Sequence, residues 1–209
     1  MAKIIVIGGG GHAKVVISIL LKMEWQVIGY SDNYDCGIIL GVPYLGDDGI
    51  LNKDFIANEA SHAIIGIGKI DESDYRMILQ KNIENIGFKF PIAISPTAVV
   101  NNEVYIGEGT IVCDGAVINS GSYIGRNCII NTNSTVEHDC KIKDNVHVAP
   151  GATICGNVHI GSNCFIGAGS NIAQLTKIPD RCLIGLGANV TGSLPSPGTY
   201  YGNPARFIK

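Results

Sequence analysis

The feature that most constrains this chain is a six-residue hydrophobic repeat that runs without a break from Ile94 to Val190. Every sixth residue is isoleucine or valine, at seventeen consecutive positions: Ile94, Val100, Ile106, Val112, Ile118, Ile124, Ile130, Val136, Ile142, Val148, Ile154, Ile160, Ile166, Ile172, Ile178, Ile184 and Val190. A period of six fits neither an amphipathic helix nor the alternation of a half-buried strand. It is typical of a hexapeptide parallel β-helix, in which each hexad contributes one short strand and one corner. The β-branched side chains would point inward and stack from coil to coil.

Small residues occupy the position four residues after each of these isoleucines and valines. Four of the seven cysteines fall there: Cys128, Cys140, Cys164 and Cys182. We expect them to be small buried residues of a reducing compartment. The other three, Cys36, Cys113 and Cys155, have no CxxC partner. The spacing therefore favours neither a disulfide framework nor a metal-bound or nucleophilic cysteine.

Composition narrows the class of partner. Charged residues make up 16% of the chain and the net charge is −3, which argues against a nucleic-acid or membrane-surface partner. No apolar run approaches 18 residues and no signal peptide is visible, so we expect a cytoplasmic protein without a membrane segment.

The first ninety residues alternate between predicted strands and helices. Strands are predicted at Lys3–Ile7, Gln26–Tyr30, His62–Ile67 and Lys89–Ile94. Helices are predicted from Ala13 to about Met23, and from an acidic first turn at Asp71, Glu72 and Asp74 to Gly87. This order predicts an α/β domain over residues 1–90, with a small Rossmann-like parallel sheet. An all-β helix of hexapeptide repeats would follow over residues 91–209, ending in a cap where Tyr200–Arg206 leaves the repeat.

A glycine-rich turn follows the first predicted strand. Gly8, Gly10 and Ala13 match the GxGxxA pattern of nucleotide-binding βαβ units, in which glycines let the backbone approach a phosphate at a helix N-terminus. Gly10, Gly11 and His12 are therefore candidate ligand contacts, as are Asp32 and Asn33 at the end of the second strand. The pattern alone does not separate a dinucleotide from a nucleotide-sugar. His12 has the alternative of bonding nearby backbone at the start of a helix.

A polar segment, NTNSTVEHD at residues 131–139, interrupts the plain hexads. Acidic neighbours on both sides of His138, namely Glu137 and Asp139, would stabilise its imidazolium and favour its use as a general base. The alternative is a surface histidine beside charged residues. His147 and His159 each precede an inward residue, so both should lie on the outside of the coil. We expect His147 to be the one that lines a ligand groove.

Taken together, these parts resemble a known family. The GGGGH turn, the βαβ domain, the unbroken hexads with the segment NTNSTVEHDC, and the GNPAR tail are similar to NeuD/PglD-like sugar acetyltransferases. Within that family the resemblance is to bacterial N-acetyltransferases that act on nucleotide-linked amino-dideoxy sugars. It covers nearly the whole chain.

The resemblance implies a left-handed β-helix, a homotrimer and acetyl-CoA bound between subunits, with no metal. It implies that His138 is the base, that Asp139 raises its basicity, and that Asn131 lies near the reacting groups. Acetyl-CoA would be contacted by His147, by the backbone of Ala168 and Leu186, and by Arg206. The nucleotide-sugar would lie against Gly10, Gly11, His12, Asp32 and Asn33. The long loop that some hexapeptide transferases insert into the coil is absent, which leaves acceptor choice to the N-terminal domain of a neighbouring subunit.

We therefore expect direct transfer of acetyl from acetyl-CoA to a sugar amine, with His138 as the general base. O-acetylation of a sialic-acid-type sugar is the alternative within the same chemistry. Two alternatives of another class are a zinc-dependent hydrase using His138, His147 and His159, and a non-catalytic nucleotide-sugar-binding scaffold. A dehydrogenase has no support outside the glycine turn. Spacing identifies neither the sugar nor the nucleotide.

Overall fold

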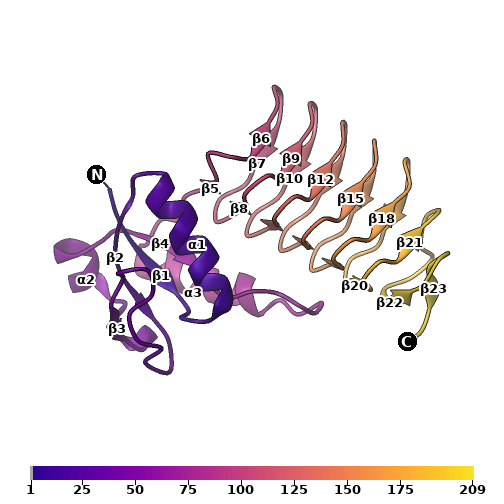
Figure 1. Cartoon of the computed structure of the whole chain (residues 1–209). Coiled ribbons are helices and arrows are strands. Elements are labelled where there is room, and N and C mark those ends of the chain that lie inside the picture. The colour runs from indigo at the N-terminus through magenta and orange to yellow at the C-terminus, as the bar shows by residue number, and fades with distance from the viewer. Residues whose placement is uncertain (1) are drawn as a thin grey trace. The chain divides into compact units, whose positions relative to one another are not determined.

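The computed structural model describes residues 2–209, which form two compact units (Figure 1). The N-terminal unit contains the residues up to Gly68 together with Tyr75–Pro96, and the coil unit contains Lys69–Asp74 and Thr97–Lys209. The main division thus lies between Pro96 and Thr97, whereas the sequence placed it after residue 90. The sequence also did not predict that a short N-terminal segment, Lys69–Asp74, would belong to the coil unit.

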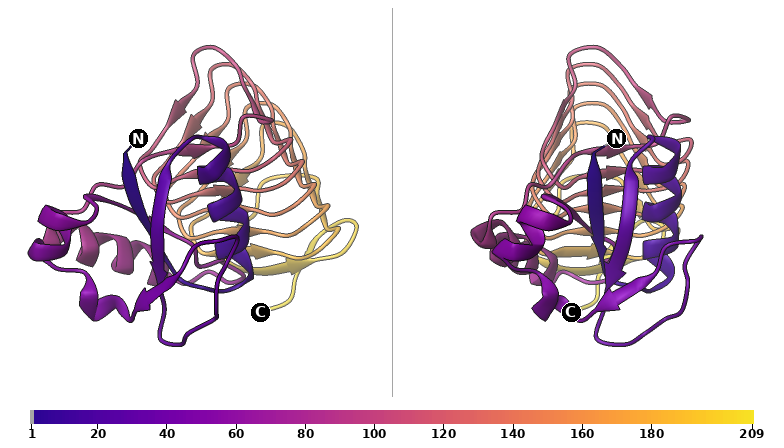
Figure 2. Two further views of the ribbon diagram at one scale, coloured as in Figure 1. Left: turned by 60° about the vertical axis from the view of Figure 1, so that its left-hand side comes forward. Right: turned by 90° about the vertical axis from the view of Figure 1, so that its left-hand side faces the viewer.

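The N-terminal unit is a four-stranded parallel sheet with helices on both faces. Its strands are β1 (Lys3–Ile7), β2 (Gln26–Ser31), β3 (Tyr44–Gly46) and β4 (His62–Ile65), in the order β3-β2-β1-β4. Helix α1 (Gly11–Lys22) covers one face, and α2 (Lys53–Asn58) and α3 (Tyr75–Ile86) lie on the other (Figure 2). A 3₁₀ turn (Asp48–Ile50) leads into α2. Alternate residues of β1 serve the two faces: Ile5 and Ile7 pack in a cluster with Ile83 of α3, and the other face meets α1.

Several predicted boundaries in this unit are wrong. Helix α3 begins at Tyr75 and not at Asp71, because Asp71 accepts the backbone N–H of Ser73 and closes a local turn instead. The predicted strand over residues 89–94 is only a bridge at Lys89 and the two-residue strand β5 (Ala93–Ile94). Strand β3 and helix α2 were not predicted, since both are short and neither has a clear hydrophobic period.

The coil unit is a parallel β-helix with two-residue strands on three sheets (Figure 2). One sheet contains β7 (Tyr105–Ile106), β10 (Tyr123–Ile124), β13 (Lys141–Ile142), β16 (His159–Ile160) and β19 (Lys177–Ile178). The second contains β6 (Val99–Val100), β9 (Val117–Ile118), β12 (Thr135–Val136), β15 (Thr153–Ile154), β18 (Asn171–Ile172) and β21 (Asn189–Val190). The third includes β8 (Ile111–Val112), β11 (Ile129–Ile130), β14 (His147–Val148), β17 (Phe165–Ile166) and β20 (Cys182–Ile184).

Successive coils stack in perfect register. Tyr123 pairs with both Tyr105 and Lys141, so that each position repeats after 18 residues. The inward isoleucines and valines of the middle coils, such as Ile118, Val136 and Ile154, are fully buried, as the six-residue repeat predicts. The repeat therefore forms one continuous core that no coil could bury alone.

The corners of the coil have a second period that the hydrophobic pattern does not reveal. Every sixth residue from Glu103 to Gly187 has a positive φ, and most of these residues are glycine or asparagine. Only such residues enter the left-handed region at low cost, so they set the bend between adjacent sheets. Asp139 lies at one of these corners, with φ of 59°.

The C-terminal end of the coil is covered by two strands. β22 (Gly198–Tyr201) runs parallel to β20, and β23 (Arg206–Phe207) folds back antiparallel to it. The expected cap is thus present, and it pairs the last edge of this sheet. Among residues 2–209, no helix has both the length and the apolar character needed to span a membrane.

Candidate active site

His138 lies at the corner between β12 and β13, with its side chain largely exposed. Its Nδ1 is 2.8 Å from Oδ2 of Asp139, the next residue. A carboxylate accepts only, so Nδ1 carries the proton in this contact and Nε2 is left as the acceptor. The pair therefore presents an imidazole whose basic nitrogen faces away from Asp139.

The other acidic neighbour of His138 is turned to a different partner. Oε2 of Glu137 accepts the Asn119 side-chain amide at 2.9 Å, and Asn119 in turn accepts the amide of Asn101 at 2.6 Å. These three residues occupy one column of the coil, 18 residues apart. Sequence alone left open which acid acts on His138, and the geometry assigns Asp139.

A glycine makes room for the His138 ring. A Cβ at Gly156, one coil further on, would lie 2.7 Å from Nε2 and 2.8 Å from Cε1 of His138. The ring and this glycine open onto a pocket of about 500 Å³, lined by Glu137, His138, Asp139, Cys155, Gly156, Asn157, Gln174 and Leu175. Nε2 thus has a concave space beside it in which a reacting group can be held.

We expect Asp139→Asn to lower kcat by about 10²- to 10³-fold, because an amide in place of the carboxylate no longer fixes the tautomer of His138. Asparagine tolerates the left-handed corner, so the coil should remain folded. Steady-state kinetics beside Glu137→Gln, the matched control, test this. A larger loss in the Glu137 variant would show that the wrong acid has been assigned.

Asn131 and His147 contact each other. The Asn131 amide nitrogen is 2.9 Å from Nε2 of His147, and Nδ1 of His147 donates to the Lys69 carbonyl. The His147 side chain projects from β14 as predicted, but it is only 7% exposed. The expectation of an open position lining a groove is therefore wrong for this chain on its own, because both ring nitrogens are engaged. No hydrogen bond joins Asn131 to His138 within residues 2–209.

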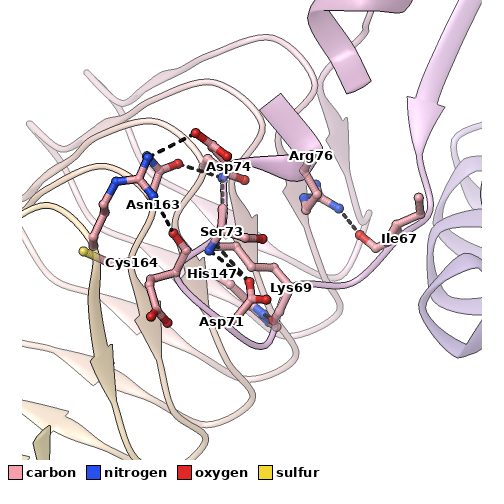
Figure 3. Close-up of polar contacts among 12 residues, drawn as sticks. Ile67, Lys69, Asp71, Ser73, Asp74, Arg76, His147, Asn163 and Cys164 are labelled. Carbon is pink, nitrogen blue, oxygen red and sulfur yellow. Dashed lines mark hydrogen bonds and ion pairs between the residues drawn. The ribbon is translucent and has the colours of Figure 1, made fainter. Parts of the chain in front are cut away.

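The segment that covers His147 is Lys69–Asp74, which is attached to the coil at three points (Figure 3). Besides the His147 bond, the Asn145 amide donates to the Ser73 carbonyl at 3.0 Å, and Arg181 pairs with Asp74 at 3.1 Å. The acidic residues that predicted a helix start thus belong instead to a loop that packs on the outside of the coil.

The other predicted acetyl-CoA contacts lie in the later coils. Ala168 and Leu186 occupy equivalent corners of adjacent coils, where the Gly187 N–H donates to the Ala168 carbonyl at 2.9 Å. Within residues 2–209, the backbone N–H groups of Ala168 and Leu186 donate to no acceptor. Arg206 lies in β23 with its side chain exposed. These groups are placed so that a ligand along this edge could use them.

The predicted nucleotide contacts lie together at the end of β1 and β2. Oδ2 of Asp32 accepts the Gly9 N–H at 2.6 Å, which ties the glycine turn to β2. A Cβ at Gly10 or Gly11 would meet nothing within 4 Å, so the turn is open on that side. Gly10 is the N-cap of α1, and His12 lies in its first turn. Asn33 follows with its side chain exposed.

Family models match both units: the PglD N-terminal domain over residues 3–72, and the bacterial transferase hexapeptide repeat over residues 121–156 and 139–174. The acetyltransferase domain of PglB from Neisseria gonorrhoeae FA1090 is 32% identical, with a TM-score of 0.91 and 100% coverage of both chains. The chain belongs to the PglD-like family of sugar acetyltransferases.

Two further members of the PglD-like family support this assignment. A histidine-to-asparagine mutant of perosamine N-acetyltransferase from Caulobacter crescentus is 34% identical, with a TM-score of 0.94, and the match covers 100% of this chain and 98% of that one. WeeI from Acinetobacter baumannii AYE is 31% identical, with a TM-score of 0.84 and full coverage of both chains. Among curated proteins none matches significantly. The chain is accordingly an acetyltransferase with a left-handed β-helix.

Two residues of this PglD-like site were not found from the sequence. Asn119 was not singled out, although its place 18 residues before Glu137 would have revealed the contact. Gly156 was also overlooked. It is 18 residues after His138, so the coil period would have located the glycine that faces the ring.

Proposed function

We propose that the chain transfers acetyl from acetyl-CoA to the amine of a nucleotide-linked amino-dideoxy sugar, with His138 as general base. The observation that carries the proposal is the orientation of His138, whose Nδ1 is held by Asp139 while Nε2 faces the pocket. The likeness to perosamine N-acetyltransferase, a structure that holds CoA and GDP-perosamine, supports the choice of an amino sugar as acceptor.

In the proposed reaction the sugar amine attacks the thioester carbonyl, forming a C–N bond, while Nε2 of His138 takes the amine proton. The tetrahedral oxyanion then collapses with cleavage of the C–S bond, and the proton passes from His138 to the leaving CoA sulfur. The Gly156 N–H donates to no acceptor within residues 2–209, which makes it available to the oxyanion. The protein thus supplies a base and an anion-stabilising group on one corner of the coil.

No cysteine is needed as a covalent acetyl carrier. Burial raises the pKa of Cys113 to about 12 and the pKa of Cys140 to about 11, so both thiols stay protonated near neutral pH. We expect that the protein incubated with acetyl-CoA alone gains no acetyl group on any cysteine, as measured by intact-mass and peptide mass spectrometry. A stable or transient acetyl-cysteine would overturn direct transfer.

Acetyl-CoA is proposed to lie along the corner that contains Ala168 and Leu186, whose unused N–H groups suit the carbonyls of the pantetheine arm. Arg206 suits one of its phosphates. Asn131 and His147 are proposed to act in the same site across a subunit boundary. This requires a homotrimer in which a neighbouring chain completes the site, and light scattering of the purified protein would measure the trimer mass. We also propose a cytoplasmic location.

The nucleotide part of the acceptor is proposed to bind the glycine turn, with Gly10, Gly11, His12, Asp32 and Asn33 as its contacts. We expect Asp32→Ala to raise KM for the nucleotide-sugar at least tenfold, since the variant loses a ribose acceptor and the bond that orders Gly9. KM for acetyl-CoA should not change. Equal increases in both KM values would show a general loss of structure rather than a nucleotide contact.

A thiol-release assay with acetyl-CoA and a panel of nucleotide-linked amino and hydroxy sugars tests the proposed function. Release of CoA with an amino sugar, and not with its hydroxy counterpart, is the expected result. Release only with hydroxy sugars would overturn N-acetylation in favour of O-acetylation. Failure to bind acetyl-CoA at all, measured by calorimetry, would overturn the proposal.

A further inference from the structure

The outer face of the sheet β7-β10-β13-β16-β19 has an unusual ladder of side chains. In-register pairing places Tyr105, Tyr123, Lys141, His159 and Lys177 in one row, each on the strand next to the last. The two tyrosine rings stack in parallel, with centroids 4.7 Å apart and an interplanar angle of 7°. The aromatic half of the row therefore continues directly into a basic half.

The two lysines of this row are not neutralised by the protein. Among residues 2–209, no carboxylate lies within 4.0 Å of either Lys141 or Lys177. Elsewhere on the coil, Arg126 lies 3.1 Å from Glu108 and Lys143 lies 3.5 Å from Asp180. Parallel strands lie about 4.8 Å apart, so the two lysine backbones are separated by roughly 10 Å across the strand that contains His159. Basic groups aligned in this way repel one another unless an anion lies between them.

This face is also concave. A cavity of about 430 Å³ is lined by Tyr123, Lys141, Lys143, His159, Ile160, Gly161, Lys177, Ile178, Pro179, Asp180 and Leu194. Its one acidic residue, Asp180, is already engaged, since its carboxylate pairs with Lys143 and accepts the Ser162 N–H at 2.9 Å. The cavity shares no residue with the pocket at His138.

We propose that this cavity is a binding site for the phosphate groups of a ligand, held by Lys141 and Lys177 with Lys143 at the rim. The distance between the lysines suits a diphosphate, which can contact both ammonium groups at once. The apolar part of the lining, which includes Leu194 and Pro179, suits the less polar part of the same ligand. Two sources fit this chemistry: the phosphates of acetyl-CoA, and a separate phosphorylated ligand.

Titration with inorganic pyrophosphate at low ionic strength, followed by calorimetry, tests the site without requiring acetyl transfer. Wild-type protein should bind, and the double variant Lys141→Gln with Lys177→Gln should bind at least tenfold more weakly, because each loses a charged hydrogen bond. The matched control, Lys53→Gln with Lys81→Gln, removes the same charge from exposed positions of the other unit and should bind like wild type.

Absence of binding to wild type, or equal weakening in the control, would overturn the site. Steady-state kinetics of the double variant then separate the two sources. A raised KM for acetyl-CoA, with kcat unchanged, assigns the phosphates to acetyl-CoA. Unchanged KM values for both substrates, together with loss of pyrophosphate binding, assign the site to a separate ligand. Because pyrophosphate binding is measured directly, failure of the proposed enzymatic function would not obscure the result.

Discussion

Replacing His138 by alanine should lower kcat by about 10²- to 10⁴-fold, because the variant has no group at the pocket that can accept the proton of the attacking amine. The side chain is exposed and its only hydrogen-bond partner is the adjacent Asp139, so its loss should cost little stability. We expect unchanged thermal unfolding and unchanged affinity for acetyl-CoA. Stopped-flow detection of CoA release at saturating substrates would measure the effect.

The control for this prediction is His62→Gln, which removes a histidine from β4 of the N-terminal unit and should leave kcat unchanged. A His138→Ala variant that keeps wild-type turnover would rule out the base assignment. A variant that loses acetyl-CoA binding as well would indicate a structural role for this histidine.

The second large effect is expected for Gly156→Ala, which adds a single methyl group. Its Cβ would lie 2.7 Å from Nε2 of His138, so the imidazole must move. A displacement of this size in a general base typically costs about 10²-fold in turnover. The loss should fall on kcat, with the pairing of His138 to Asp139 retained in a crystal structure of the variant.

Gly192→Ala is a matched control, because Gly192 occupies the same hexad position two coils further on. A Cβ there would meet nothing within 4 Å. This variant should keep its turnover and its stability. If both variants lost activity equally, the effect would come from the backbone of the corner and not from contact with His138.

The sequence predicted the coil well because one physical requirement, an inward β-branched residue at every strand, repeats in every hexad. It predicted the N-terminal unit less well. There the acidic residues Asp71 and Asp74 indicated a helix start, but contacts far away in sequence decide the structure: Arg181 binds Asp74 and His147 binds the Lys69 carbonyl. Such contacts have no local signature.

The candidate site was predictable only in part for the same reason. Adjacent residues, such as His138 and Asp139, were paired correctly from sequence, since a neighbour in the chain is a neighbour in space. His147 was placed on the correct side of the coil but was expected to be open, because nothing in its own hexad indicates that Lys69–Asp74 covers it. Gly156 and Asn119 required the coil period to be applied to polar as well as apolar positions.

The fixed coil length gives this fold a simple geometry for insertions and deletions. Eighteen residues added between His138 and the cap would lengthen the coil by roughly one strand spacing, about 4.8 Å, without changing the direction in which any corner points. Six residues added at the same place would instead turn everything beyond them by a third of a revolution, moving each sheet's residues to another face. A lineage that lengthens or shortens this enzyme while keeping its site intact should therefore do so in whole coils.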